Sequence, residues 1–447
     1  MKKVAFLALA ISLFVSSLAA APSEDLTTLV PKREKLLNGL SVLVIERPNS
    51  GNVALHIVIK SGTTFDPLGK SGVADLTAQM MLRGGSGGWT GERLKEELSD
   101  INARLEITTG WDATELRMLG RSADIDALVN ILGRVITQPQ FVEQSFEQLK
   151  AERIKSLEVA PVPTTLADEA FFNALYGSHP YGHNVIGTKE SLAPLTRFDI
   201  NDFYNRFYLA NNSSLIIVGD VSIERMLPSL RKAFGGWRKG NIPPYTFVPP
   251  KENPGVNIRL IERADQTTTE IRLGNFTLRR TDSDYLPTQL LVAILNRRLA
   301  AHKELKLEAV LAARKLRGPF LVSASVPVKE APTVLSATLA EIKRLGERIE
   351  AAELQAAKDQ LIEEYKAGFN ANTEIAARWA EVENYNLGSA YVINYTRQVN
   401  QISIEDLRRV TKYFSPDNLT IAVLGRAREL ETELKKFGKL EIAGVNK

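Results

Sequence analysis

Hydrophobic and polar positions repeat along the chain with two different periods. Residues 41–46 and 53–60 are short apolar runs rich in β-branched side chains, and the second run places its apolar residues on one face. A period of two predicts strands, and the Pro-Asn-Ser-Gly-Asn segment between the runs predicts a hairpin turn. Helical periodicity follows at residues 73–82, 91–101, 125–135 and 143–158. The fold class is therefore predicted to be α+β, with a sheet and flanking helices.

One part of this pattern occurs twice, at an offset of 206 residues. Residues 206–234 and 412–437 each contain a polar turn, an apolar run, a glycine and an amphipathic segment, and Gly219 of the first copy corresponds to Gly425 of the second. A similar helical segment precedes each copy. The repeat predicts two homologous α/β sandwich domains related by internal duplication, rather than three unrelated domains.

The join between the two halves is predicted to be a linker. The stretch from Gly235 to Gly255 is rich in Pro and Gly, which a continuous helix or a central strand does not tolerate. Together with an N-terminal segment treated below, this gives the predicted organisation: segment 1–21, N-terminal domain 22–236, linker 237–255 and C-terminal domain 256–447.

The first residues have the features of a secretory signal peptide. Lys2 and Lys3 precede an apolar run over residues 4–15, and small residues follow to Ala19–Ala21, where we expect cleavage. A membrane anchor is the alternative, but the run is shorter than the ~20 residues that span a bilayer. The mature protein is expected to be secreted or periplasmic, with no integral membrane segment.

Composition narrows the possible chemistry. The 447 residues include no Cys, which excludes disulfides and thiolate metal sites. The formal charge of +4 falls to +2 without Lys2 and Lys3 and is spread along the chain, so no nucleic-acid partner is expected. His179 and His183 are four residues apart, but Pro and Gly between them favour a loop, and a His pair alone is a weak zinc signal.

The segment from Gly69 to Gly85, GKSGVADLTAQMMLRGG, resembles the motif helix of the pitrilysin/insulinase zinc peptidases. In that family an inverted H-x-x-E-H motif supplies two zinc-binding His and a general-base Glu. The corresponding positions here are Asp75, Ala78 and Gln79. The resemblance therefore implies a degenerate site without catalytic residues. An oxygen-only Ca²⁺ or Mg²⁺ site at Asp75 and an ordinary polar helix face are the alternatives.

The resemblance continues over essentially the whole mature chain, including residues 179–221, 267–295 and 352–369. Glu152-Arg153 resembles the start of the helix that carries the family's third zinc ligand, but that position falls on Val159, with Glu158 beside it. In the second half, Arg298 (or Arg297) matches a substrate-binding Arg, while Ala313 stands where a Tyr is expected.

Family members bind peptide by adding it to a sheet edge, and the segment that matches this edge is Leu105, Glu106, Ile107, Thr108 and Thr109. Main-chain pairing tolerates sequence change, so the resemblance implies a substrate-binding strand here. An ordinary edge strand is the alternative.

Taken together, these features suggest a non-catalytic subunit that forms a heterodimer with an active zinc-peptidase homologue and encloses a peptide substrate with it. Zinc is expected only in that partner, so no cofactor is assigned to this chain. A homodimer, a metallopeptidase with an unrecognised site, and a purely structural or peptide-binding scaffold are the alternatives.

Overall fold

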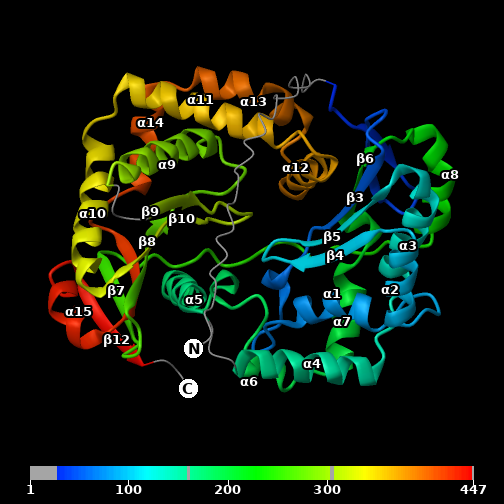
Figure 1. Ribbon diagram of the computed structural model, residues 1–447, viewed down its shortest axis with the longest axis horizontal. Coiled ribbons are helices and arrows are strands. Elements are labelled where there is room, and N and C mark those ends of the chain that lie inside the picture. Colours follow the sequence, from blue (N-terminus) through cyan, green and yellow to red (C-terminus); the bar gives the residue numbers. More distant parts are fainter. Residues whose placement is uncertain (1–27, 159–161, 303–306, 445–447) are drawn as a thin grey trace, which may run out of the picture.

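The computed structural model describes residues 28–158, 162–302 and 307–444, which form two similar halves (Figure 1). In the N-terminal half a six-stranded sheet has the order β1-β2-β6-β3-β5-β4. Its strands are β1 (Lys32–Lys35), β2 (Ser41–Glu46), β3 (Asn52–Ile59), β4 (Arg104–Thr109), β5 (Thr114–Arg121) and β6 (Ser213–Gly219). Its helices are α1 (Val73–Arg83), α2 (Gly91–Asp100), α3 (Ile125–Thr137), α4 (Glu143–Glu158), α5 (Pro163–Tyr176), α6 (Lys189–Leu192), α7 (Arg197–Phe207) and α8 (Ile223–Phe234).

The C-terminal half repeats this arrangement in a sheet of order β12-β7-β11-β8-β10-β9. Its strands are β7 (Val256–Glu262), β8 (Thr268–Phe276), β9 (Leu307–Leu311), β10 (Pro319–Pro327), β11 (Leu419–Gly425) and β12 (Lys439–Gly444). Its helices are α9 (Tyr285–Ala300), α10 (Ala331–Glu347), α11 (Ala351–Ala367), α12 (Asn372–Tyr385), α13 (Ser389–Gln401), α14 (Ile404–Val410) and α15 (Ala427–Leu434).

Five strands of each sheet match in order and direction, whereas the outer strands differ, because β1 is antiparallel to β2 and β12 is parallel to β7. β2 and β6 are parallel, as are β7 and β11, and the remaining inner pairs of both sheets are antiparallel. β6 and β11 are separated by the 206-residue offset seen in the sequence. The predicted α+β fold of two duplicated halves is therefore confirmed. Between Phe234 and Val256, the described residues form no helix or strand.

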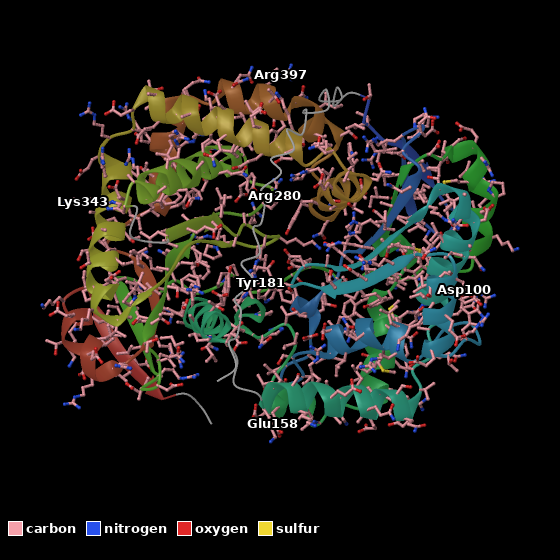
Figure 2. The ribbon with its side chains drawn as sticks, in the orientation of Figure 1. Asp100, Glu158, Tyr181, Arg280, Lys343 and Arg397 are labelled. Atoms are coloured by element: carbon pink, nitrogen blue, oxygen red, sulfur yellow. The ribbon has the colours of Figure 1, made fainter. Side chains whose placement is uncertain are left out.

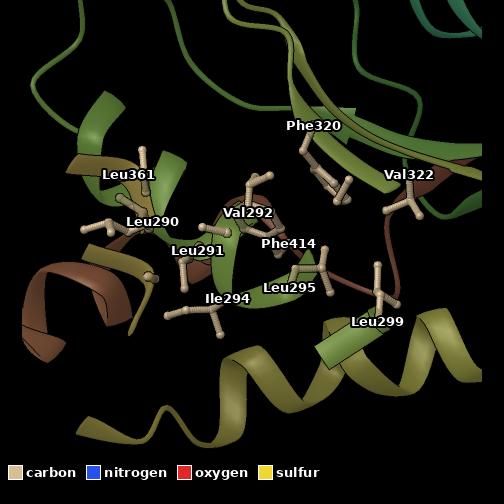
Figure 3. Packing of buried hydrophobic residues seen from close by; sticks show 14 of the residues in the cluster. Leu290, Leu291, Val292, Ile294, Leu295, Leu299, Phe320, Val322, Leu361 and Phe414 are labelled. Atoms are coloured by element: carbon tan, nitrogen blue, oxygen red, sulfur yellow. The ribbon is translucent and has the colours of Figure 1, made fainter. Parts of the chain in front are cut away.

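One large hydrophobic cluster lies within the N-terminal half, and a second fills the C-terminal half and extends onto β2, β3 and β6 of the N-terminal sheet. In the N-terminal half, Val53, Leu55, Ile57 and Ile59 of β3 all face this core, as their alternation predicts. In the C-terminal half, α9 is buried along most of its length. Figure 3 shows the leucines of α9 together with Phe320 and Val322 of β10, which belong to the same cluster of buried residues.

The two halves also exchange helices across the space between them. α12 of the C-terminal half packs on β3 and β6 of the N-terminal sheet, and α5 of the N-terminal half packs on β8 and β11 of the C-terminal sheet (Figure 1). Trp379 of α12 is fully buried, and its indole N–H donates to the carbonyl of Leu29 at 3.1 Å. Phe171 of α5 is fully buried in a cluster with Phe276 of β8. Each sheet therefore has one face covered by a helix of the other half.

No described helix is long and apolar enough to cross a lipid bilayer. The predicted signal peptide at residues 1–21 lies outside the described residues.

Candidate functional site

α1 carries the three positions that match the zinc-peptidase motif. Its start is fixed by Asp66, whose carboxylate accepts the backbone N–H groups of Gly72 and Ala74 at 2.7 and 3.0 Å. Gly72 has a φ of +96°, a left-handed conformation that suits glycine. Asp75 and Gln79, four residues apart, lie on one side of the helix, and Ala78 is fully buried. Asp75 is only 5% exposed, so this side of α1 is not a solvated polar face.

Arg153 of α4 lies against Asp75. Its Nη2 donates to Oδ2 of Asp75 at 2.6 Å, and the Asp75 side chain is almost completely buried. Burial raises the pKa of Asp75, while the charge and the hydrogen bond of Arg153 oppose that rise. A guanidinium cation therefore balances the one acidic group among the three motif positions.

The donor set at this place does not fit zinc. Zn²⁺ prefers neutral imidazole nitrogen, thiolate and carboxylate ligands in a tetrahedral arrangement. Here one carboxylate is paired with an arginine and the second potential ligand, Gln79, is a neutral amide. Glu158 points elsewhere, because its carboxylate pairs with Lys189 at 3.3 Å, and Val159 lies outside the described residues. Among the residues that the structure describes, no group of three His, Cys, Asp or Glu side chains is placed to hold a metal ion.

β4 passes directly beside this degenerate motif. The Gln79 side-chain amide donates to the carbonyl of Ile107 at 3.3 Å, and β4 is the outer strand of its sheet. Ile107 is buried under the sheet, while Glu106 and Thr108 are exposed and Leu105 and Thr109 are half-buried. The structure therefore brings Gln79 of the motif together with the strand predicted to bind peptide.

Two adjoining cavities follow β4 and β5 into the space between the halves. The first has a volume of about 320 Å³ and is lined by the turn from Thr108 to Ala113, by β5, by Arg314 and by the end of α12. The second, of about 360 Å³, shares Glu115, Arg117 and the end of α12 with the first and extends to Arg280. Figure 2 shows Tyr181 and Arg280 between the two halves.

Asp112 joins the two halves and the linker at the first cavity. It is 5% exposed and accepts hydrogen bonds from the hydroxyls of Tyr181 and of Tyr245 in the linker. Its second carboxylate oxygen accepts the backbone N–H of Lys315 at 2.9 Å. The Lys315 ammonium donates to the carbonyls of Lys60 and Asp112, and burial lowers the pKa of this lysine to about 8. This network fixes one wall of the cavity across the domain boundary.

Comparison with known proteins matches both halves. The family described as "Insulinase (Peptidase family M16)" matches residues 41–189, and the one described as "Peptidase M16 inactive domain" matches residues 194–361, which together cover more than half of the chain. This chain belongs to the M16 (insulinase) peptidase family. The pitrilysin/insulinase assignment made from the sequence is therefore confirmed.

Among its relatives are two bacterial proteins that align over most of their length. One is an "Uncharacterized zinc protease" of Rickettsia bellii, 23% identical over 88% of this chain and 96% of the relative. The other is "Zinc protease PqqE" of Helicobacter pylori, 23% identical over 88% of this chain and 93% of the relative. A "Mitochondrial-processing peptidase subunit beta" of Saccharomyces cerevisiae is 22% identical over 47% of this chain and 46% of its own.

Solved structures share the M16 fold. A structure described as the peptidase M16 inactive domain from Pseudomonas fluorescens has a TM-score of 0.82 at 22% identity, covering 89% of this chain and 98% of its own. The periplasmic protease PqqL from Escherichia coli has a TM-score of 0.75 at 17% identity, covering 94% of this chain and 49% of its own.

The residues of the C-terminal half that the sequence resemblance matched to substrate-binding positions lie apart from the motif helix. Arg298 is buried within the C-terminal half, where it donates to Glu353 at 2.8 and 2.9 Å and to the carbonyl of Arg348. Neither cavity includes Arg298 in its lining, so its role in substrate binding stays a prediction. Arg297 beside it is exposed. Ala313, at the family's Tyr position, lines the second cavity.

Sequence reasoning missed the residues that line the cavities from the C-terminal half. Arg314 stacks on the ring of Trp111, with its guanidinium carbon 3.6 Å from the ring centroid, and Arg280 is buried between two tyrosine rings. Arg153 was visible only as part of a family match. The basic run from Arg314 to Arg317 was the one available signal, and a run of charges usually indicates a solvated surface.

Proposed function

We propose that this chain is a non-catalytic, exported M16 subunit that binds peptide on β4 and works with an active zinc-peptidase homologue. The observation that carries the proposal is the Asp75–Arg153 pair, because it puts an arginine guanidinium beside the motif helix, where the family places a metal ion. The proposal for export rests on the charged and apolar pattern of residues 1–21.

The absence of a general base supports the non-catalytic role. Ala78 occupies the position of the family's Glu and has no group that accepts a proton. General-base catalysis contributes typically about 10²–10⁴-fold to a rate. The site therefore lacks both a set of zinc ligands and a general base. A substitution that restored only the ligands or only the base would not restore hydrolysis.

The retained architecture supports peptide binding. β4 still lies at the sheet edge beside the motif helix, and its end lines the cavity of about 320 Å³ between the halves, which adjoins the one of about 360 Å³. Backbone pairing at a sheet edge depends on main-chain groups and not on the lost side chains. A subunit that presents substrate to a homologue's zinc site needs this edge and does not need a metal.

The relatives' names fit a paired arrangement. The Saccharomyces cerevisiae protein is named a subunit of a processing peptidase, and two bacterial relatives are named zinc proteases. For this chain we expect the zinc to be bound by the partner, in a homologue that carries an intact H-x-x-E-H motif.

The experiment compares the full chain alone with the full chain co-purified with an H-x-x-E-H homologue from the same genome. We expect no stoichiometric zinc and no peptide cleavage by the chain alone, and one zinc per pair with chelator-sensitive cleavage by the complex. A control pair uses a homologue whose motif Glu is replaced by Gln, which removes the general base. One zinc per copy of this chain alone, with cleavage that a chelator stops, would overturn the proposal.

A further inference from the structure

Several polar atoms in the wall of the first cavity have no hydrogen-bond partner. Thr109 Oγ1, Trp111 Nε1, Arg314 Nη1 and Asn384 Oδ1 are all buried, and none of them bonds to any other residue that the structure describes. All four residues line the cavity of about 320 Å³ between the halves. A buried polar atom without a partner destabilises a fold, so nearly all such atoms in proteins are paired. Four of them around one cavity indicate a place for a bound group.

The cavity is large enough for more than a solvent molecule. One water occupies about 30 Å³ of the liquid, and small-molecule sites begin near about 300 Å³. With a volume of about 320 Å³, the cavity accommodates an amino-acid side chain or the end of a peptide.

The unpaired atoms favour a ligand rich in hydrogen-bond acceptors. Trp111 Nε1 and Arg314 Nη1 are donors, and the Thr109 hydroxyl can also donate. Arg314 carries a full positive charge, and its stacking on the Trp111 ring at 3.6 Å fixes the plane of the guanidinium. Among the described residues Arg314 forms no ion pair.

The two carboxylates in the cavity wall do not satisfy Arg314, because both are bound elsewhere. Asp112 accepts from Tyr181, Tyr245 and the backbone of Lys315. Glu115 accepts from His56 at 3.1 Å and from Arg117. The positive charge of Arg314 is therefore available to a ligand.

We propose that this cavity is a subsite for a carboxylate of the bound peptide, supplied either by an acidic side chain or by the C-terminus. The proposal rests on the proposed role of β4 in peptide binding and adds the substrate class. Thr109 is the last residue of β4, two positions beyond Ile107 at the degenerate motif, which corresponds to about 7 Å along a strand. A peptide paired with β4 thus leads from the motif into the cavity, where Arg314, Trp111 and Thr109 bind its carboxylate.

Binding of fluorescent extended peptides to the full chain, followed by polarisation, tests this subsite. One series is C-terminally amidated and carries a single Glu, or a matched Gln, at successive positions. A second series has no acidic side chain and ends in either a free carboxylate or an amide. In one of the two series, we expect a peptide with a carboxylate to bind at least tenfold more tightly than its matched neutral peptide. A preference for Glu over Gln at one position identifies an acidic side chain as the source of the carboxylate, and a preference for the free terminus over the amide identifies the C-terminus.

Three cavity variants and one control locate the preference. Arg314→Gln and Trp111→Phe should each reduce the preference to less than threefold, and Arg314→Lys should retain part of it. Trp111→Phe keeps an aromatic ring and removes only the indole N–H. The control is Arg121→Gln, on the exposed end of β5, where the arginine pairs with Asp124 at 2.7 Å, and it should keep the full preference. Circular dichroism and the thermal midpoint show that each variant is folded.

The outcomes separate this subsite from peptide binding in general. Equal affinity for acidic and neutral peptides would overturn the subsite and leave the proposed function standing. No measurable binding of any peptide would overturn both. A loss of neutral-peptide binding in folded Arg314→Gln, equal to the loss of acidic-peptide binding, would show that Arg314 shapes the cavity and does not recognise the carboxylate.

Discussion

The guanidinium of Arg153 donates to the carboxylate of Asp75 at 2.6 Å and thereby joins α4 to the motif helix α1. Because Asp75 is buried, Arg153→Ala leaves a carboxylate without its partner, and we expect the free energy of unfolding at pH 7 to fall by about 2–4 kcal/mol. The loss should be smaller at pH 5. Removal of the arginine raises the pKa of Asp75 further above its unfolded value, so the folded variant takes up a proton and regains stability as the pH falls.

Urea denaturation at pH 7 and pH 5 measures both effects. The matched control is Arg83→Ala, since Arg83 pairs with Glu152 and joins the same two helices, but both side chains are about half exposed. Exposed pairs contribute little, so the control should change stability by less than about 0.5 kcal/mol. Equal losses for the two variants would contradict a special role of the buried pair.

The Asp112 network predicts that docking of the two halves depends on one carboxylate. Asp112→Ala removes the acceptor for Tyr181, Tyr245 and the backbone of Lys315, and we expect a loss of about 3–5 kcal/mol. Tyr245 belongs to the linker, so limited proteolysis within residues 237–255 should become faster. Asp112→Asn keeps one acceptor oxygen, so its stability and its rate of linker cleavage should lie between those of the parent and those of Asp112→Ala.

The control for this prediction is Asp265→Ala. Asp265 is largely exposed and pairs only locally with Arg263. Its loss should leave both stability and linker cleavage unchanged. Unchanged linker cleavage in Asp112→Ala would show that the linker is held by other contacts.

The fold could be predicted from the sequence because its signals are local. The alternation in β3 and the 206-residue repeat follow from which side chains face a core, and five strands of each half have the same order. The exchange of α5 and α12 was not predictable in this way. An apolar helix face shows that a helix packs, but it does not show which sheet it packs on. Trp379 lies 320 residues after the end of β3 and 160 residues after the end of β6, the two strands that α12 covers.

The site was predictable only as far as the family motif extends. Asp75, Ala78 and Gln79 could be placed on one helix by their spacing, and Gln79 does lie against the predicted peptide strand. The partner of Asp75 could not be predicted, since Arg153 comes from a different helix 78 positions later. Arg314 was missed for the same reason, because its burial against Trp111 depends on how the two halves meet.

Glu115 should make stability dependent on acid pH. Burial alone would raise its pKa, but the hydrogen bond from His56 and the charges of His56 and Arg117 lower it to about 2. Its unfolded value is near 4.3, so this carboxylate stabilises the fold above about pH 4.3 and loses that effect as the pH falls toward 2. We expect the Glu115 contribution to be about 1–3 kcal/mol at pH 6.

Glu115→Gln should therefore be less stable than the parent at pH 6 and approach it near pH 2, as measured by urea titration at each pH. Glu106→Gln, on the exposed side of the neighbouring strand β4, is the control and should follow the parent at every pH. A difference between Glu115→Gln and the parent that did not change with pH would contradict this assignment.

The exchanged helices predict that neither half folds stably alone. A fragment of residues 22–236 lacks α12, which covers the face of its sheet formed by β3 and β6, and it presents α5 without the strands that α5 covers. We expect this fragment to bind the dye ANS and to aggregate, and co-expression with residues 237–447 to restore a soluble 1:1 complex.

Within the full chain, Trp379→Ala should lower the free energy of unfolding by about 3–5 kcal/mol and should disturb both halves, because the Trp379 ring packs in a cluster that includes Val58 and Ile216 of the other sheet. Phe198→Ala, at a largely exposed position of α7, is the control and should have little effect. A soluble, ANS-negative N-terminal fragment would show that the exchange of helices is not required for either half to fold.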